Sequence, residues 1–218
     1  MHKYKICVLF LFIIFLYCFE FVSANNNFPL LGKIIYLDPG HGGLDPGAIY
    51  VDTKEKEINL EISKKVETNL LKLGAIIYMT RYGDYDLSVN NTINRKRSDL
   101  SRRSNIINKS DCDLFLSIHL NAEETNTYSG AQVFYSDKNK KNIEIARIFQ
   151  EEFKKNLKST RNYKKDNSLY LLKRLKVPGI LLEVGFLSNQ NERYLLKQET
   201  YQNKIAETII SAVLTYFK

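Results

Sequence analysis

His41 and His119 are the residues of this chain whose type and placement most directly suggest chemistry. The chain has three histidines in 218 residues, and the third, His2, lies in an N-terminal segment of a different character. His41 and His119 each follow a short apolar run that is typical of a β-strand. Neutral imidazole is a common ligand of transition metals, so two imidazoles at the ends of two strands predict a metal site.

A carboxylate would complete the set, because two histidines and one carboxylate, with a fourth position left for water, form a common catalytic zinc site. Glu55, Glu57 and Glu61 lie just before or within the first long predicted helix. Glu55 is the best placed of the three, because the helix carries Glu57 and Glu61 toward solvent. The residues alone leave the choice open.

Glu183 is the second carboxylate of interest, because it interrupts the apolar run 180–184. An ionised carboxylate is costly to bury unless it is paired or hydrogen-bonded. One interpretation pairs Glu183 with an arginine such as Arg81. The other places it beside a zinc-bound water, where it would accept a proton and pass it to a leaving amine.

Strands and helices alternate along the chain, which predicts one α/β domain with a mostly parallel twisted sheet and helices on both faces. Ligands of such sheets collect at the carboxyl ends of the strands, so His41, His119 and Glu183 should meet at one edge. The predicted strands are 33–37, 75–80, 114–118, 131–135 and 180–184, with a short one at 169–172, and the predicted helices are 58–73, 92–108, 145–157 and 202–217.

Four motifs resemble those of zinc-dependent N-acetylmuramoyl-L-alanine amidases. They are Asp-Pro-Gly-His-Gly-Gly from residue 38, Glu-Lys-Glu-Ile-Asn-Leu from residue 55, His-Leu-Asn-Ala from residue 119 and Glu-Val-Gly-Phe-Leu-Ser-Asn from residue 183. They occur in the order of the family, and the resemblance runs from about residue 33 to the C-terminus. Glu57 stands where the family usually has Asp, outside the expected metal ligands.

The resemblance implies one zinc ion bound by His41, Glu55 and His119, with Glu183 as the catalytic acid and base. It also implies the reaction, which is hydrolysis of the amide between the lactyl group of N-acetylmuramic acid and the L-alanine of the peptidoglycan stem peptide. Asn121 would bind substrate or orient the metal site. Asp38 would either support His41 or cap the turn that follows it.

The layout of motifs is similar to that of amidases of the bacterial spore cortex. In that group the enzyme removes the stem peptide as a step toward muramic-δ-lactam, which germination requires, and some members depend on an accessory lipoprotein. The alternatives are a vegetative cell-wall amidase for cell separation or turnover, a zinc peptidase acting on free wall peptides, and a catalytically silent wall-binding relative.

The N-terminus has the three parts of a secretory signal: a basic start, the apolar run 6–19, and small residues before position 25. The run is shorter than the about 20 residues of a comfortable membrane span. We therefore expect residues 1–24 to be a signal peptide or an uncleaved anchor, 25–32 a short linker and 33–218 the catalytic domain. The domain would work outside the membrane, in the forespore intermembrane space and cortex or in the cell wall, and only an uncleaved anchor would hold it to the membrane.

The formal net charge of +8 would suit an acidic polymer, an anionic lipid or nucleic acid. Export makes nucleic acid an unsuitable partner, and the basic runs show no alternation with aromatic residues that would suggest base stacking. One basic run lies in the predicted helix at 94–103. Its Arg95 and Arg103 either contact stem-peptide carboxylates or a partner, or belong to a solvated helix face.

Overall fold

The computed structural model describes residues 28–218, so the predicted signal or anchor segment 1–24 and the start of the predicted linker lie outside the described residues. A six-stranded sheet with the order β4-β1-β5-β8-β6-β7 forms its centre. The strands are β1 (Ile34–Pro39), β4 (Ile76–Met79), β5 (Leu114–Asn121), β6 (Gln132–Tyr135), β7 (Lys164–Lys165) and β8 (Gly179–Phe186), and a separate hairpin joins β2 (Ile49–Tyr50) to β3 (Thr53–Lys54).

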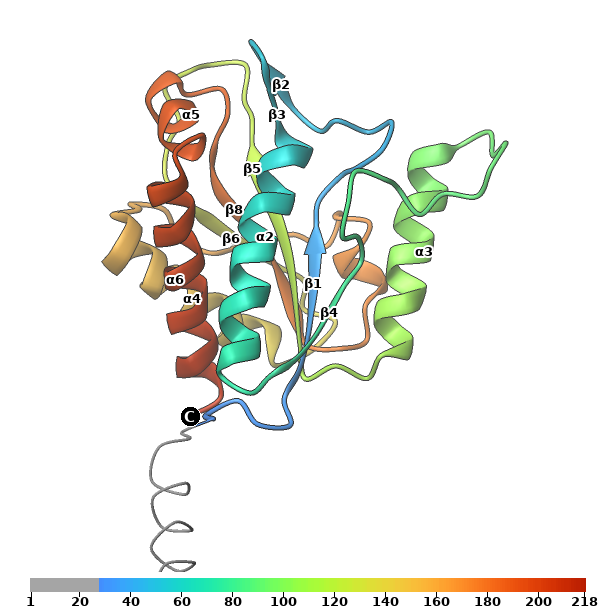
Figure 1. Cartoon of the computed structure of the whole chain (residues 1–218), viewed down its shortest axis with the longest axis vertical. Helices are drawn as coiled ribbons and strands as arrows, with labels where there is room; N and C mark the ends of the chain where they lie inside the picture. The colour runs from blue at the N-terminus through green and yellow to red at the C-terminus, as the bar shows by residue number, and fades with distance from the viewer. Residues whose placement is uncertain (1–27) are drawn as a thin grey trace, which may run out of the picture.

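Four strands of the sheet, β4, β1, β5 and β8, run parallel to one another. The strand β6 runs antiparallel to β8, and β7 is parallel to β6. The carboxyl ends of β1, β5 and β8 therefore lie at one edge of the sheet, which is the upper edge in Figure 1. This arrangement confirms the predicted mostly parallel sheet.

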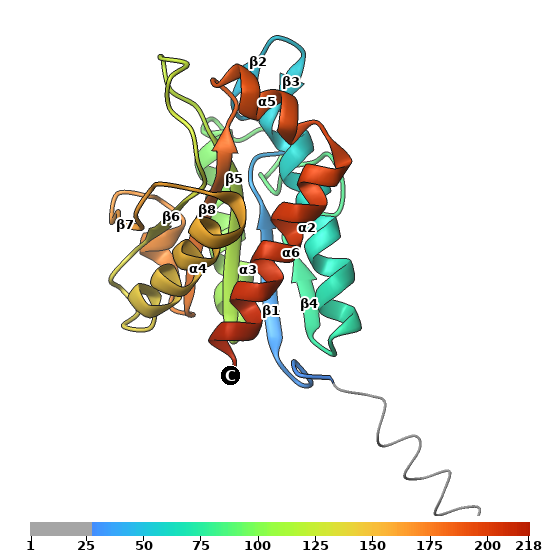
Figure 2. The same ribbon diagram turned by 90° about the vertical axis from the view of Figure 1, so that its left-hand side faces the viewer.

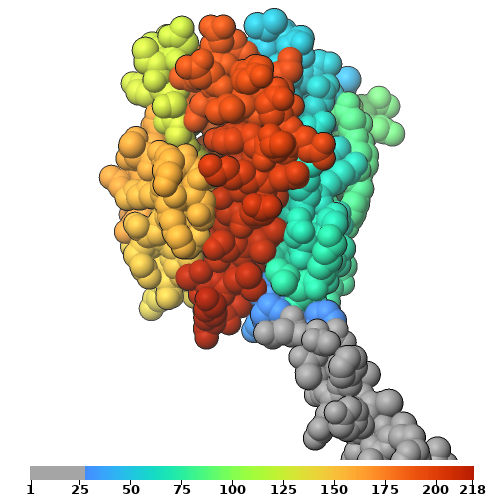
Figure 3. Space-filling view, turned by 60° about the vertical axis from the view of Figure 1, so that its left-hand side comes forward, coloured from blue at the N-terminus to red at the C-terminus, as the bar shows by residue number. Residues whose placement is uncertain are grey.

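Helices cover both faces of the sheet, as predicted (Figures 1 and 2). The helices α2, α4 and α6 lie on one face, where α6 runs between the other two (Figure 3). The helix α3 and the short 3-10 helix η1 lie on the opposite face. The bounds are α2 (Glu55–Lys72), α3 (Arg95–Lys109), α4 (Asn142–Leu157), η1 (Leu172–Arg174), α5 (Gln190–Leu196) and α6 (Glu199–Tyr216).

Alternate residues of the central strands build a separate apolar cluster on each face, because neighbouring side chains of a strand point to opposite sides. Leu116 and Leu182 pack toward α2, α4 and α6, in a cluster that also contains the α6 residue Ile209. Phe115 and Leu181 pack on the other side, toward α3 and η1. Burying each such side chain stabilises the fold by roughly 1.5–3 kcal/mol, so the two clusters hold the sheet rigidly beneath the functional edge.

The structure departs from the prediction in several elements: α2, α4 and α6 each begin three residues earlier than predicted, and the hairpin β2–β3 and the helix α5 were not predicted. Two further differences have a clear physical reason. The strand predicted at 169–172 is wrong: this segment turns into η1, with Leu171 and Leu172 packed in the cluster beneath α3. Its apolar side chains fill that cluster without pairing as a strand, and the short edge strand lies instead at β7. The helix predicted from residue 92 begins at Arg95, because the Asn94 side chain accepts a hydrogen bond from the Arg97 amide and caps the first turn.

Within residues 28–218, no helix is both long enough and apolar enough to cross a membrane.

Candidate active site

The candidate site lies at the carboxyl ends of β1, β5 and β8, where the sequence predicted it. His41 follows β1 with a positive φ of 62°, and His119 lies on β5. The loop passes so close to β5 that a Cβ at Gly40 would overlap the His119 ring. Glycine is therefore required at this position for the two imidazoles to meet. Their ring centroids are 4.9 Å apart.

Glu55, the first residue of α2, lies between the two imidazoles. Its Oε2 is 3.1 Å from Nε2 of His41, and its Oε1 is 3.0 Å from Nδ1 of His119. One ligand atom from each of these residues lies within 4.8 Å of the other two. Glu57 and Glu61 are both exposed, which agrees with the expected order of preference among the three carboxylates.

Backbone and side-chain donors fix the Glu55 carboxylate. Oε2 accepts from the Ala48 amide at 2.9 Å, and Oε1 accepts from the Leu120 amide and the Asn59 side chain, both at 3.1 Å. Burial opposes ionisation of Glu55, but the hydrogen bonds from the two imidazoles outweigh it and hold its pKa far below the usual range. The group is therefore a carboxylate, as a metal ligand must be.

Asp45 is a functional residue that the sequence reasoning missed. Its Oδ2 lies 2.9 Å from Nδ1 of His41, which leaves Nε2 of that ring facing Glu55. The hydrogen bond with His41 lowers the pKa of Asp45 to about 2. Burial lowers the pKa of His41, but the bonds to Asp45 and Glu55 outweigh it and raise that pKa to about 9. A carboxylate four residues after the histidine, in a turn rich in glycine and proline, was the available signal.

Asp38 does not cap the turn and does not contact the His41 ring; it reaches the backbone of His41 through Arg103. It is 1% exposed, and it accepts hydrogen bonds from the hydroxyls of Thr80 at 2.6 Å and Ser117 at 2.7 Å. Arg103 donates to it at 2.7 Å. Asp38 thus ties β1 to β5, to the end of β4 and to α3 beneath the site.

Arg103 extends this network to the loop that carries His41. It is 1% exposed, bonds Asp99 through Nε at 2.8 Å, and donates from Nη2 to the His41 carbonyl at 2.6 Å. The guanidinium thereby fixes the backbone of one predicted metal ligand.

Glu183 does not pair with Arg81. Arg81 donates instead to the backbone carbonyls of Pro39, Gly40 and Lys56. Glu183 is the register partner of His119 on the neighbouring strand, and its Oε2 is a buried polar atom without a hydrogen-bond partner among the described residues. Burial, with the nearby Glu55 charge, raises the pKa of Glu183 to about 8.

These groups open into a cavity of about 270 Å³. His41, His119 and Glu183 line it on the side of the sheet, and Lys96 and Tyr170 line it on the side of α3 and the segment before η1. Two imidazoles and a carboxyl group of raised pKa line this cavity, and the Glu55 carboxylate lies between the imidazoles, an arrangement that is suited to metal-assisted hydrolysis.

Comparison with known families decides which hydrolysis this is. The sequence profile of the family described as N-acetylmuramoyl-L-alanine amidase matches residues 35–215. The chain belongs to this amidase family. The match spans every strand and helix that positions the site.

Named relatives agree with this assignment. The chain is 43% identical over 216 residues to the germination-specific N-acetylmuramoyl-L-alanine amidase of Bacillus subtilis, covering 94% of this chain and 91% of the relative. It is 32% identical to the amidase LytC of the same organism, covering 90% of this chain and 38% of LytC. This amidase therefore acts on peptidoglycan, at the bond between muramic acid and L-alanine.

Solved structures share the fold of the amidase. The CwlD amidase from Clostridioides difficile, in complex with the GerS lipoprotein, superposes with a TM-score of 0.81 at 39% identity, covering 85% of this chain and 98% of that chain. A second N-acetylmuramoyl-L-alanine amidase, from Clostridium difficile 630, superposes with a TM-score of 0.76 at 32% identity, covering 84% of this chain and 96% of that chain.

The residues predicted to bind the amidase's substrate lie in different surroundings. Arg95 is exposed, is not among the lining residues of the active-site cavity, and pairs with Asp86 at 2.9 Å. Arg103 is buried beneath the site, and Asn121 accepts a hydrogen bond from the Ala122 amide at 2.8 Å. Their contact with substrate stays a prediction.

Proposed function

We propose that this amidase is a zinc enzyme in which His41, Glu55 and His119 bind one zinc ion and Glu183 is the catalytic acid and base. The donor set supports the metal, because two imidazoles and an ionised carboxylate are held close together and oriented by further hydrogen bonds. When bound, zinc would polarise the amide carbonyl and activate water for attack.

The observation that carries the proposal is the unpartnered Oε2 of Glu183 beside the three ligands. A buried polar atom without a partner is rare, and an oxygen at this place is free for a reacting molecule. Glu183 would take a proton from the attacking water and return it to the nitrogen of the departing L-alanine. Burial raises the pKa of Glu183 from its ordinary value toward the neutral range, where a carboxyl group can both accept and donate a proton.

The proposal is tested on purified cortex-type peptidoglycan with the exported part of the chain, with zinc and with a chelator. Mass spectrometry should find stem peptides released from muramic acid in the zinc sample and none in the chelated sample. Release that survives chelation, with no metal in the protein, would contradict zinc dependence. Cleavage of free wall peptides with intact muropeptides would instead indicate a peptidase. Zinc binding without turnover would indicate a silent wall-binding relative only if turnover stays absent when the lipoprotein partner is added.

We further propose that the amidase acts during maturation of the spore cortex, as a step toward muramic-δ-lactam. The identity to the germination-specific relative over nearly the whole chain supports this role. A strain without the gene should form spores whose cortex lacks the lactam and which germinate poorly. Normal cortex with defective cell separation would favour the vegetative alternative.

Export and an accessory lipoprotein complete the proposal. Residues 1–24 would direct the chain across the membrane, to the forespore intermembrane space and cortex, as a cleaved signal or an anchor. A partner is suggested by the relative CwlD, whose structure contains the GerS lipoprotein. The mass of the mature protein from spores decides between cleavage and anchoring, and co-purification from the same spores identifies a partner.

A further inference from the structure

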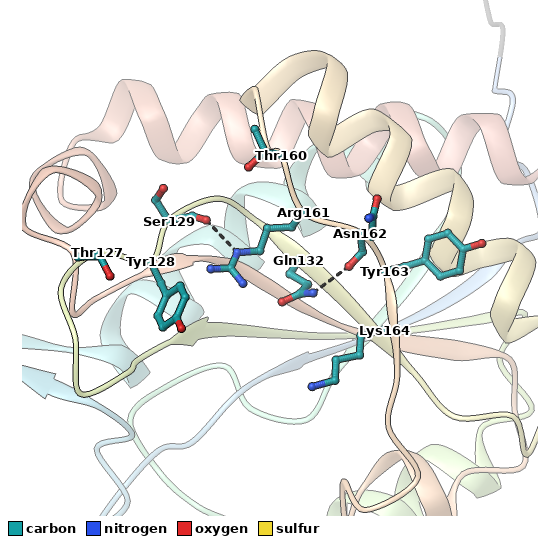
Figure 4. A pocket seen from close by; sticks show the side chains of 9 residues that line it. All are labelled: Thr127, Tyr128, Ser129, Gln132, Thr160, Arg161, Asn162, Tyr163 and Lys164. Carbon is teal, nitrogen blue, oxygen red and sulfur yellow. Dashed lines mark hydrogen bonds between the residues drawn. The ribbon is translucent and has the colours of Figure 1, made fainter.

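A second cavity, of about 620 Å³, opens at the end of the sheet beside β6 and β7 (Figure 4). Nothing in the proposed metal chemistry uses it. Hydroxyl and amide side chains line it together with two cations, and no carboxylate is among its lining residues. Its lining residues include Tyr128, Ser129, Gln132, Arg161, Asn162 and Lys164.

Arg161 is held in one orientation in this cavity. Its guanidinium lies 4.5 Å from the ring centre of Phe186 and 5.3 Å from that of Tyr128. Nε donates to the Ser129 carbonyl at 2.9 Å, as the dashed line in Figure 4 shows. The terminal nitrogens make no hydrogen bond within residues 28–218. Stacking on two aromatic rings therefore fixes a guanidinium whose two terminal donors remain available.

No carboxylate of the described part of the chain forms an ion pair with Arg161. Glu192 lies within electrostatic range, but its two oxygens accept from the amides of Gly130 at 2.9 Å and Phe186 at 2.7 Å. These bonds join the loop before β6 to the end of β8, which are the two walls that hold Arg161. A planar guanidinium with two free donors matches the geometry of a carboxylate from a ligand.

The cavity adjoins the catalytic groups across one pair of strands. Gln132 of β6 is the register partner of Glu183 on β8, so both side chains project from the same face of the sheet. Phe186, on which Arg161 stacks, comes three residues after Glu183, and the irregular pairing with β5 sets the two residues opposite His119 and Asn121, about two residues or roughly 7 Å apart along the strand. An extended peptide covers this distance in about two residues.

We propose that this cavity is a subsite for a free carboxylate of the stem peptide, bound by Arg161. The inference rests on the proposed function, because the stem peptide is the leaving group of that reaction. The carboxyl of muramic acid itself is tied up in the scissile amide, and the sugar rings carry no charge. A carboxylate that reaches Arg161 therefore comes from a peptide residue two or three positions beyond the scissile bond.

Peptide binding tests the subsite without turnover. Two released stem peptides that differ only in a free carboxylate or a carboxamide on the second residue are titrated into the zinc-loaded protein by calorimetry. The wild type should bind the carboxylate roughly tenfold more tightly, as expected for loss of charge-assisted hydrogen bonds. Arg161→Gln should remove this preference and Arg161→Lys should keep part of it. Equal affinity of the wild type for both peptides would overturn the proposal, as would a preference that survives Arg161→Gln.

Lys165→Ala is the matched control, because it removes one positive charge from β7 at a residue that pairs with Asp137 outside the cavity. It should retain the full preference for the carboxylate, and loss of the preference in this control would overturn a specific role for Arg161. In turnover, Arg161→Gln should raise KM for the carboxylate substrate and leave kcat close to that of the wild type. A wild type that binds the carboxylate peptide but releases none from peptidoglycan would contradict the proposed function and leave the subsite supported.

Discussion

Glu183 and His119 are register partners on the neighbouring parallel strands β8 and β5, and their side chains meet at the same cavity. The pairing has a functional consequence, because the sheet itself sets the distance between a carboxyl group that can exchange protons and a predicted metal ligand. Neither residue depends on a mobile loop for this placement. If a metal is bound as proposed, the arrangement would place it and the Glu183 carboxyl group next to the same bound amide.

Replacing Glu183 with Gln should lower kcat by about 10²–10⁴-fold, the usual contribution of a general acid or base. The zinc content should not change, because the predicted ligands His41, Glu55 and His119 are untouched. Turnover on muropeptides and metal analysis of the same sample measure both effects. Glu67→Gln, which changes a carboxyl of α2 outside the cavity, should behave as the wild type. Full activity of Glu183→Gln would contradict the assignment.

Replacing Asp45 with Asn should weaken zinc binding by about 10–100-fold, the usual effect of removing a hydrogen-bond partner of a ligating histidine. The carboxylate fixes the orientation and tautomer of His41 through Nδ1. Competition with a chromogenic chelator measures the affinity. The control is Asp52→Asn, an exposed aspartate that pairs with Lys197 and should leave the affinity unchanged. Unchanged zinc affinity in Asp45→Asn would show that His41 does not need this support.

Much of the site was predictable because its residues lie where apolar strands end. The runs that became β1, β5 and β8 are recognisable from composition, and parallel strands bring their carboxyl ends together whatever the lengths between them. His41, His119 and Glu183 therefore converge as expected. The direction of β6 was not predictable, because the alternation of buried and half-buried residues in Gln132–Tyr135 is the same for either direction.

The supporting contacts were not predictable for a different reason. The bond from Arg103 to Asp38 joins residues 65 positions apart, and it depends on how α3 packs on the sheet. In the sequence, Arg103 is one of several basic residues on a polar helix, and only its burial distinguishes it from its neighbours. The strand prediction at 169–172 was wrong for a similar reason: the apolar residues of this segment pack beneath α3 and do not pair with another strand.

Replacing Arg103 with Ala should destabilise the protein by about 3–5 kcal/mol, the cost of leaving a buried partner charge uncompensated. Asp38 is the charge left behind, and Asp99 loses its bond as well. Urea unfolding measures the free energy. The neighbouring Arg102 is exposed, and Arg102→Ala should change the free energy of unfolding by less than about 0.5 kcal/mol. An Arg103→Ala protein with normal stability and a raised KM would instead support the predicted contact with substrate.

The pH dependence of stability should reveal the protonation of Glu183. Its folded pKa of about 8 lies above the about 4.3 of an unfolded glutamate, so between these values the folded state binds more protons than the unfolded state. The free energy of unfolding of the metal-free wild type should therefore fall as pH rises through this window. The glutamine side chain of the Glu183→Gln variant does not ionise, so the variant does not lose stability in this way. Its free energy of unfolding relative to that of the wild type should therefore increase by a few kcal/mol between about pH 5 and pH 8.

Urea unfolding of both proteins in chelator, at several pH values across the window, measures this difference. The raised pKa of His41, about 9, gives stability that is present below about 6.5 and is lost as pH rises through 9. That contribution is present in both proteins, so the comparison removes most of it, and what remains is the electrostatic coupling between His41 and Glu183. Two stability curves that run parallel from pH 5 to pH 8 would show that Glu183 ionises normally, and its role in donating a proton to the leaving nitrogen would then need a different cause.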